Sequence, residues 1–97
     1  MKNISPKEAR ELIKNKEFII LDVRTPEEYQ QNHLEGAINI DIYMKTFEEE
    51  LKKLDKNKSY LIHCHSGGRS ENAGEIMEEL GFKYITNVIG FLFPHLE

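Results

Sequence analysis

The segment best suited to do chemistry begins at Cys64, the single cysteine of the chain, and runs to Ser70. Two adjacent glycines, Gly67 and Gly68, allow the backbone to turn tightly, so that successive amides can face one point. Arg69 adds a cation, and a helix that follows the loop would turn its positive end toward the same point. Such surroundings lower the pKa of a thiol from about 8.5 to between about 3.5 and 7.5. The pattern therefore predicts a thiolate nucleophile near neutral pH.

We accordingly predict that Cys64 is catalytic and that the rest of the loop binds substrate. The predicted substrate-binding residues are His65, Ser66, Gly67, Gly68, Arg69 and Ser70. Their donors would hold an anionic substrate or a persulfide formed on the sulfur. His65 either lies over the sulfur, as a modest cation or proton donor, or faces solvent. The alternatives are a buried, inert cysteine, an ordinary glycine turn, and a surface cation or a structural ion pair for the arginine.

The cysteine needs a strand that delivers it and a helix that follows it. Residues 59–63, Ser-Tyr-Leu-Ile-His, are typical of a strand that runs directly into Cys64. Beyond the loop, we expect a helix that starts at Ser70 and ends near Gly81. Its apolar positions recur at i, i+3, i+4 and i+7: Ala73, Ile76, Met77 and Leu80. Cys64 would then lie at the carboxyl end of a strand, where parallel sheets bind ligands.

Further helices and strands alternate along the chain. Strands are expected at residues 18–21, 37–40 and 84–89, and a helix at 46–54. Ser5-Pro6 and Thr25-Pro26 each combine a capping residue with a proline suited to the first helical position, so a helix is expected to follow each pair. Short connections between strands and helices favour an α/β fold with a mostly parallel central sheet and helices on both faces. The 97 residues allow one domain, residues 1–97.

Composition excludes several classes of function. The net charge of −4 disfavours a nucleic-acid surface, which needs clustered basic residues. No apolar run is long enough to span a membrane, and the start lacks the pattern of a signal peptide. We therefore expect a cytoplasmic monomer, in which a lone cysteine stays reduced. The final Leu96-Glu97 is of the kind that precedes a purification tag.

Three motifs in order resemble the family of rhodanese-like sulfurtransferases. Cys-x-x-Gly-x-Arg-Ser, at residues 64–70, is similar to the active-site loop of that family. Residues 21–29, Leu-Asp-Val-Arg-Thr-Pro-Glu-Glu-Tyr, and residues 33–40, His-Leu-Glu-Gly-Ala-Ile-Asn-Ile, resemble its two upstream motifs. Leu80-Gly81-Phe82 resembles the turn after the active-site helix. The resemblance implies a rhodanese-like single domain.

The resemblance also implies a reaction. Cys64 would take the outer sulfur of a small anionic donor, thiosulfate or a persulfide, and carry it as a cysteine persulfide. A thiol, or cyanide in assays, would accept the sulfur, and a sulfur-relay protein is a further candidate partner. No cofactor and no metal are implied. Glu71 would weaken the positive field over the loop, so we do not expect a strong thiosulfate enzyme on grounds of charge.

The chain departs from the family pattern at its end. A Gly-Gly pair and a final helix, often with tryptophan, are common in the family, whereas here Ile89-Gly90 is followed by Phe91-Leu92-Phe93-Pro94. Either Phe91 and Phe93 replace the missing packing, or they form an exposed apolar patch.

Other readings of the same residues stay open. A cysteine phosphatase also uses a thiolate in a loop that ends in arginine, but it places five residues between the two, and here four separate Cys64 from Arg69. A non-catalytic interaction module on the same fold is the third candidate. His63, Cys64 and His65 suggest a metal, although further ligands are not evident. Asp22 and Arg24 are expected to form a buried structural pair, with Glu28 and His33 in the same network or at the surface.

Overall fold

A parallel sheet organises the chain, of which the computed structural model describes residues 1–93. Within that range, five strands pair in the order β1-β5-β4-β2-β3, and each pairing is parallel. The strands are β1 (Lys2–Ile4), β2 (Phe18–Asp22), β3 (Ile38–Asn39), β4 (Ser59–His63) and β5 (Tyr84–Val88). The central strand β4 pairs with β2 and β5 and carries the chain directly to Cys64.

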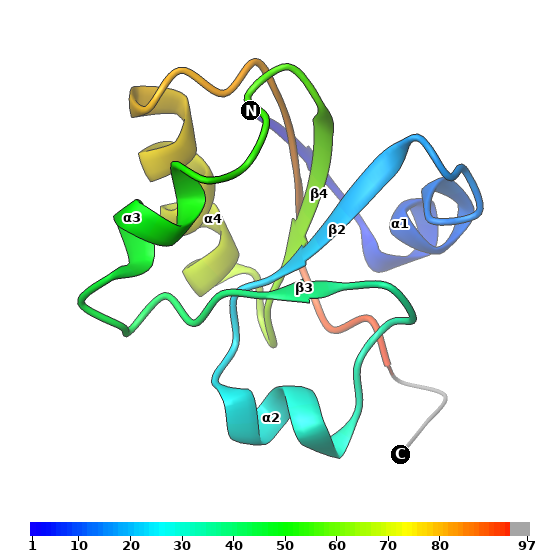
Figure 1. Ribbon diagram of the computed structural model, residues 1–97. Helices are drawn as coiled ribbons and strands as arrows, with labels where there is room; N and C mark the ends of the chain where they lie inside the picture. Colours follow the sequence, from blue (N-terminus) through cyan, green and yellow to red (C-terminus); the bar gives the residue numbers. More distant parts are fainter. Residues whose placement is uncertain (94–97) are drawn as a thin grey trace.

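Helices cover both faces of this sheet. The described residues form α1 (Pro6–Leu12), α2 (Pro26–Gln31), α3 (Phe47–Leu51) and α4 (Gly68–Glu79). Figure 1 shows α1 on one side of the sheet and α3 and α4 on the other, while α2 lies beyond the ends of the strands. The predicted α/β fold, with a parallel sheet between helices, is confirmed.

Local capping explains where two of the helices begin. Ser5 precedes α1, and its hydroxyl oxygen accepts a hydrogen bond from the Glu8 amide at 3.2 Å. Thr25 precedes α2 and forms a complete capping box with Glu28, whose side chain accepts from the Thr25 amide at 3.1 Å. These bonds satisfy amides that a helix start leaves unpaired, and each is worth about 1 kcal/mol.

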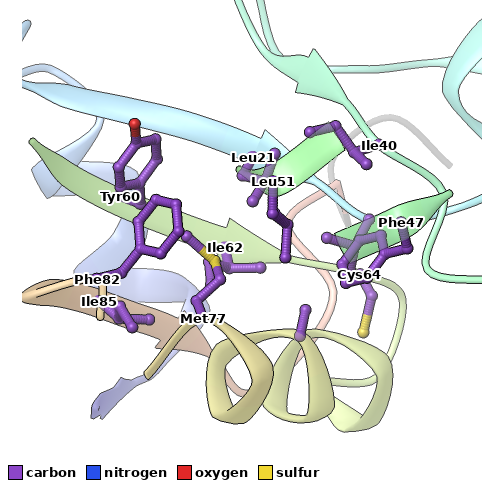
Figure 2. Packing of buried hydrophobic residues seen from close by; sticks show 12 residues of the cluster. Leu21, Ile40, Phe47, Leu51, Tyr60, Ile62, Cys64, Met77, Phe82 and Ile85 are labelled. Carbon is purple, nitrogen blue, oxygen red and sulfur yellow. The ribbon is translucent and has the colours of Figure 1, made fainter. Parts of the chain in front are cut away.

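Two hydrophobic clusters hold the layers together. The larger cluster lies between the sheet and the α3–α4 face, and Cys64 belongs to it together with Phe47 and Met77 (Figure 2). The smaller cluster lies on the α1 face and includes Leu92 and Phe93, which are 1% and 2% exposed. The segment after β5 therefore packs into the domain, which resolves the alternatives left open for its phenylalanines. Phe91 is half-buried rather than part of a free apolar patch.

One strand was not predicted, and several element boundaries differ from those expected. The strand β1 was not expected, because Lys2-Asn3-Ile4 is short and only its last residue is buried. It pairs with β5 at the sheet edge, a contact that no local pattern reports. The helix expected from Ser70 begins at Gly68, and the helix expected at residues 46–54 spans only Phe47–Leu51.

Two further expectations concern the last residues of the chain and a membrane-spanning helix. Leu96-Glu97, together with Pro94, lies outside the described residues. Among residues 1–93, no helix combines the length and the apolar character needed to cross a bilayer.

Candidate active site

Cys64 lies at the carboxyl end of β4, immediately before the loop that leads into α4. Its side chain has no exposed surface, and its sulfur is directed toward α4 (Figure 2). Although the residue packs with the core, the sulfur does not lie among apolar groups alone, because backbone and hydroxyl groups of the loop contact it. The position is the one that the alternation of strand and helix predicts for a functional residue.

The loop surrounds the sulfur with hydrogen-bond donors. The amides of Gly67 and Ser70 donate to the Cys64 Sγ atom at 3.1 and 3.3 Å. The Ser70 hydroxyl oxygen accepts from the Cys64 thiol at 3.4 Å, and the Ser70 hydroxyl donates to the Gly67 carbonyl oxygen at 3.1 Å. A thiol can donate to this oxygen, whereas a thiolate can accept from the hydroxyl once its hydrogen rotates. The same serine therefore has a partner in both protonation states of the cysteine.

These contacts change the acidity of the thiol. Burial by itself raises the pKa of Cys64, because it disfavours the charged form. The Ser70 hydroxyl and the amides of Ser70, Gly67 and Arg69 stabilise the thiolate and outweigh burial, so the net pKa of the thiol lies below its ordinary value. The direction of the shift agrees with the sequence prediction, and its source is the loop backbone and one hydroxyl.

The two glycines of the loop have different roles. Gly67 has a φ of +102°, which favours glycine, and a Cβ atom at this position would lie 3.0 Å from the Ile89 Cα atom. Gly68 is instead the first residue of α4, and a Cβ atom there would meet nothing within 4 Å. Of the two glycines expected to let the backbone turn, Gly67 alone has the positive φ, and Gly68 already belongs to α4. The Gly67 carbonyl accepts from the Glu71 amide at 3.0 Å, so the helical hydrogen bonds begin before Ser70.

Arg69 does not act as the isolated cation that the sequence suggested. Its guanidinium forms a two-pronged ion pair with Glu28 of α2, with Nη1–Oε1 and Nη2–Oε2 distances of 2.7 and 3.0 Å. The ring of Tyr43 lies 5.9 Å from the guanidinium carbon. The structural ion pair, which was the alternative for this residue, is therefore present. The pKa of Arg69 is raised, chiefly by the hydrogen bond to Glu28, so the arginine stays charged.

The two remaining loop residues face away from the core. His65 and Ser66 are exposed, and the His65 ring lies against Phe91 with ring centroids 4.6 Å apart. The solvent-facing alternative for His65 is therefore the one observed. The amides that contact the sulfur belong to the second half of the loop, and the structure brings Gly67, Arg69 and Ser70 to Cys64.

A buried charged cluster lies behind the loop, on the neighbouring strand. The Asp22 carboxylate accepts from the Arg24 side chain, with Nη2–Oδ2 and Nε–Oδ1 distances of 2.7 and 2.9 Å, and both side chains are almost fully buried. The Arg24 guanidinium also donates to the Asn32 carbonyl at 2.6 Å and lies over the ring of Phe93. The expected buried pair is confirmed. It joins β2 to the segment after α2.

His63 and His33 belong to different surroundings. His63 is fully buried, with its Nε2 atom 3.6 Å from the Asp22 carboxylate, and burial lowers its pKa below 6.5. His33 is exposed and stacks on Tyr29 with ring centroids 3.8 Å apart. In the part of the chain that the structure describes, no three His, Cys, Asp or Glu side chains gather as metal ligands would.

Sequence reasoning missed the partners that come from distant segments. Glu28 is 41 positions from Arg69, and its place in a capping box explains the helix but not the ion pair. Phe91 and Tyr43 flank the loop from segments that carry no recognisable motif. For the Glu28–Arg69 contact, the sequence offered one signal, which was the presence of opposite charges in the two motifs that resemble the family.

Comparison with known proteins agrees with this geometry. The family model of the rhodanese-like domain matches residues 5–93. Thiosulfate sulfurtransferase GlpE of Coxiella burnetii is 35% identical over 89 residues, covering 92% of this chain and 81% of the relative. Thiosulfate sulfurtransferase PspE of Escherichia coli is 40% identical over 72 residues, covering 72% and 67%.

A solved structure supports the same relationship. A rhodanese-related protein from Thermoplasma volcanium has a TM-score of 0.82 and 30% identity, covering 99% of this chain and 91% of that one. The family model, the curated relatives and the solved structure thus agree, and the chain belongs to the family of rhodanese-like domains.

Proposed function

We propose that this protein is a sulfurtransferase that moves sulfane sulfur from thiosulfate or a persulfide to a thiol, or to cyanide, through a persulfide on Cys64. The observation that carries the proposal is the pair of amides, from Gly67 and Ser70, that donate to the cysteine sulfur. The names of the curated relatives, which are thiosulfate sulfurtransferases, support the same reaction class. A reducing compartment such as the cytoplasm suits this chemistry, because the nucleophile must stay a free thiol.

In the first half-reaction, the Cys64 thiolate attacks the outer sulfur of the donor. A sulfur–sulfur bond forms on the cysteine, the donor's own sulfur–sulfur bond breaks, and the electron pair leaves with sulfite or a thiolate. The lowered pKa increases the fraction of Cys64 that is present as the attacking thiolate near neutral pH. Because Cys64 has no exposed surface, the atoms around it must move before a donor can reach the sulfur.

In the second half-reaction, an acceptor thiolate or cyanide attacks the outer sulfur of the persulfide. The Cys64 thiolate is the leaving group, and the amides of Gly67 and Ser70 that stabilise it lower the barrier to its departure. The Ser70 hydroxyl can follow the change of charge by rotating from the Gly67 carbonyl to the sulfur. The loop thus serves the nucleophile in one step and the leaving group in the other.

Intact-protein mass spectrometry tests the proposal, because Cys64 is the single cysteine of the chain. Incubation with thiosulfate or a persulfide should add one sulfur atom per chain, and cyanide should remove it as thiocyanate. Cys64→Ser is the matched control and should gain nothing. Absence of a gain with every donor would favour a non-catalytic module. Cys64-dependent hydrolysis of para-nitrophenyl phosphate would instead support the phosphatase alternative.

A further inference from the structure

The positive charge of Arg69, in the loop that surrounds the Cys64 sulfur, is balanced by Glu28 of α2. Glu28 accepts from both terminal nitrogens of Arg69, and the two side chains are 31% and 21% exposed. Paired, planar hydrogen bonds of this kind are the strongest geometry between a guanidinium and a carboxylate. The pair therefore fixes Arg69 on α2 and cancels most of its charge at the loop.

Glu28 stays ionised over the whole physiological range. The hydrogen bond from Arg69 lowers its pKa most, burial opposes this, and bonds from Thr25 add to the lowering, so that the pKa falls from 4.5 to about 2. The Thr25 amide and hydroxyl both donate to the Oε1 atom at 3.1 Å. The carboxylate is thus held in place by its own helix as well as by the arginine.

No further fixed cation compensates within the loop. Between Cys64 and Ser70, Arg69 is the only lysine or arginine, and the next residue, Glu71, is an exposed acid at the start of α4. The field that reaches the sulfur therefore comes mainly from the loop amides and the end of α4. The helix end carries only about half a unit of positive charge, which offsets a smaller share of the charge of a dianion than of a monoanion.

The two classes of donor differ in charge. Thiosulfate arrives as a dianion, and its reaction with the thiolate yields the Cys64 persulfide and sulfite dianion. A persulfide of an uncharged thiol arrives as a monoanion and yields the same Cys64 persulfide and a thiolate. Atoms and charge balance in both reactions, but the first brings one more negative charge to the site.

We propose that Glu28 sets donor specificity, by neutralising Arg69 so that the loop favours monoanionic persulfides over dianionic thiosulfate. The inference rests on the proposed sulfurtransferase function for its meaning in the cell. The underlying effect, which is that Cys64 reacts at different rates with reagents of different charge, can be measured without sulfur transfer.

The variant Glu28→Gln removes the charge while keeping the local structure. Glutamine is accepted at this position of a capping box, so its side-chain oxygen can still accept from the Thr25 amide. Glu27→Gln is the matched control, because it removes the same charge from an exposed neighbour on the same helix. The double variant Glu28→Gln with Arg69→Gln restores neutrality and separates charge from shape.

Alkylation gives the first measurement. Iodoacetate and iodoacetamide react with a thiolate in the same way, but only iodoacetate is charged. At an effective dielectric of about 20, two unit charges one Debye length apart (about 8 Å at physiological salt) change a rate ratio roughly 30-fold, and screening over that length reduces this to roughly fourfold. The ratio of iodoacetate to iodoacetamide rates should therefore rise roughly fourfold in Glu28→Gln. It should stay at the parent value in Glu27→Gln and return to it in the double variant. An unchanged ratio in a folded Glu28→Gln overturns the inference.

Sulfur loading gives the second measurement, with thiosulfate and the persulfide of N-acetylcysteamine as donors. The parent should load faster from the persulfide, and Glu28→Gln should shift the rate ratio roughly fourfold toward thiosulfate. If the parent loads sulfur but the ratio of the thiosulfate rate to the persulfide rate is the same in the parent and in Glu28→Gln, the specificity claim is overturned. The sulfurtransferase proposal then still stands. If neither donor loads the parent, the sulfurtransferase proposal fails, and the alkylation ratio still decides whether Glu28 controls charge at the thiol.

Discussion

Replacing Asp22 by asparagine should destabilise the fold while leaving the chemistry of the cysteine loop nearly intact. The substitution keeps the size and one acceptor of the side chain but removes its charge. Arg24, whose side chain is 3% exposed, then has no carboxylate partner, and its remaining acceptors are the amide oxygen of the new asparagine and the oxygens of Asn32. The change removes one member of a buried pair, which is the costly way to alter such a pair.

The size of the effect follows from burial and geometry. Asp22 has no exposed surface and accepts hydrogen bonds from the Arg24 amide, Nε and Nη2 atoms at 2.7–3.1 Å. Loss of one partner from a buried pair costs about 3–5 kcal/mol, and the acceptor that asparagine keeps places this case near about 3 kcal/mol. In a domain of this size, about 3 kcal/mol lowers the Tm by roughly 12–24 °C.

Urea unfolding followed by far-ultraviolet circular dichroism measures the change, with Asp55→Asn as the control. Asp55 is exposed, and its replacement should alter stability by less than about 0.5 kcal/mol. Alkylation of Cys64 well below the transition should proceed at nearly the parental rate in both variants. A variant at Asp22 that unfolds like the parent but no longer loads sulfur would show that this carboxylate acts in the reaction.

Four other predictions concern single groups. Ser70→Ala should raise the pKa of the Cys64 thiol, seen as a shift of the pH profile of alkylation to higher pH; an unchanged profile would remove the hydroxyl from the account. Gly67→Ala should destabilise the protein by more than about 1 kcal/mol, because of its positive φ and the close Ile89 backbone, whereas Gly68→Ala should be neutral or stabilising in urea unfolding. The pKa of Glu28 is lowered from 4.5 to about 2, so its contribution to the free energy of unfolding is present above pH 4.5 and should be lost as the pH falls toward 2. Partial exposure limits this contribution to about 1 kcal/mol. Glu28→Gln should therefore make the free energy of unfolding less dependent on pH between about 2 and 4.5. Burial lowers the pKa of His63, so the protein should be most stable above pH 6.5 and should lose stability below it as the unfolded chain takes up a proton at this residue. His63→Phe should reduce the slope of the free energy of unfolding against pH in this range. An unchanged slope would show that His63 is not the group responsible.

Much of the fold was predictable because its determinants are local. The apolar run of β2 and the helical spacing in α4 each specify an element within about a dozen residues. Capping residues before the prolines marked two helix starts, and both are found where expected. The strand β1 was not predictable, since its three residues become a strand only by pairing with β5 at the far end of the chain.

The candidate site divides in the same way. The position of Cys64 follows from a strand, a glycine and a helix that adjoin in sequence, and the donors to its sulfur come from the next six residues. An ion pair of Arg69 was among the alternatives, but its partner Glu28 was not identified because it comes from α2, and the packing of Phe91 on His65 was missed because the last segment folds back. Gly68 was assigned to the turn because sequence alone does not tell which of two glycines has the positive φ.

The most direct test of a sulfur-carrying Cys64 is a single turnover with isotopically labelled sulfane sulfur. The loaded protein is freed of donor and mixed with cyanide. The account predicts one labelled atom per chain before mixing, its recovery as labelled thiocyanate afterwards, and a free thiol on Cys64. Label that never binds, or that appears in thiocyanate equally with Cys64→Ser, would contradict it.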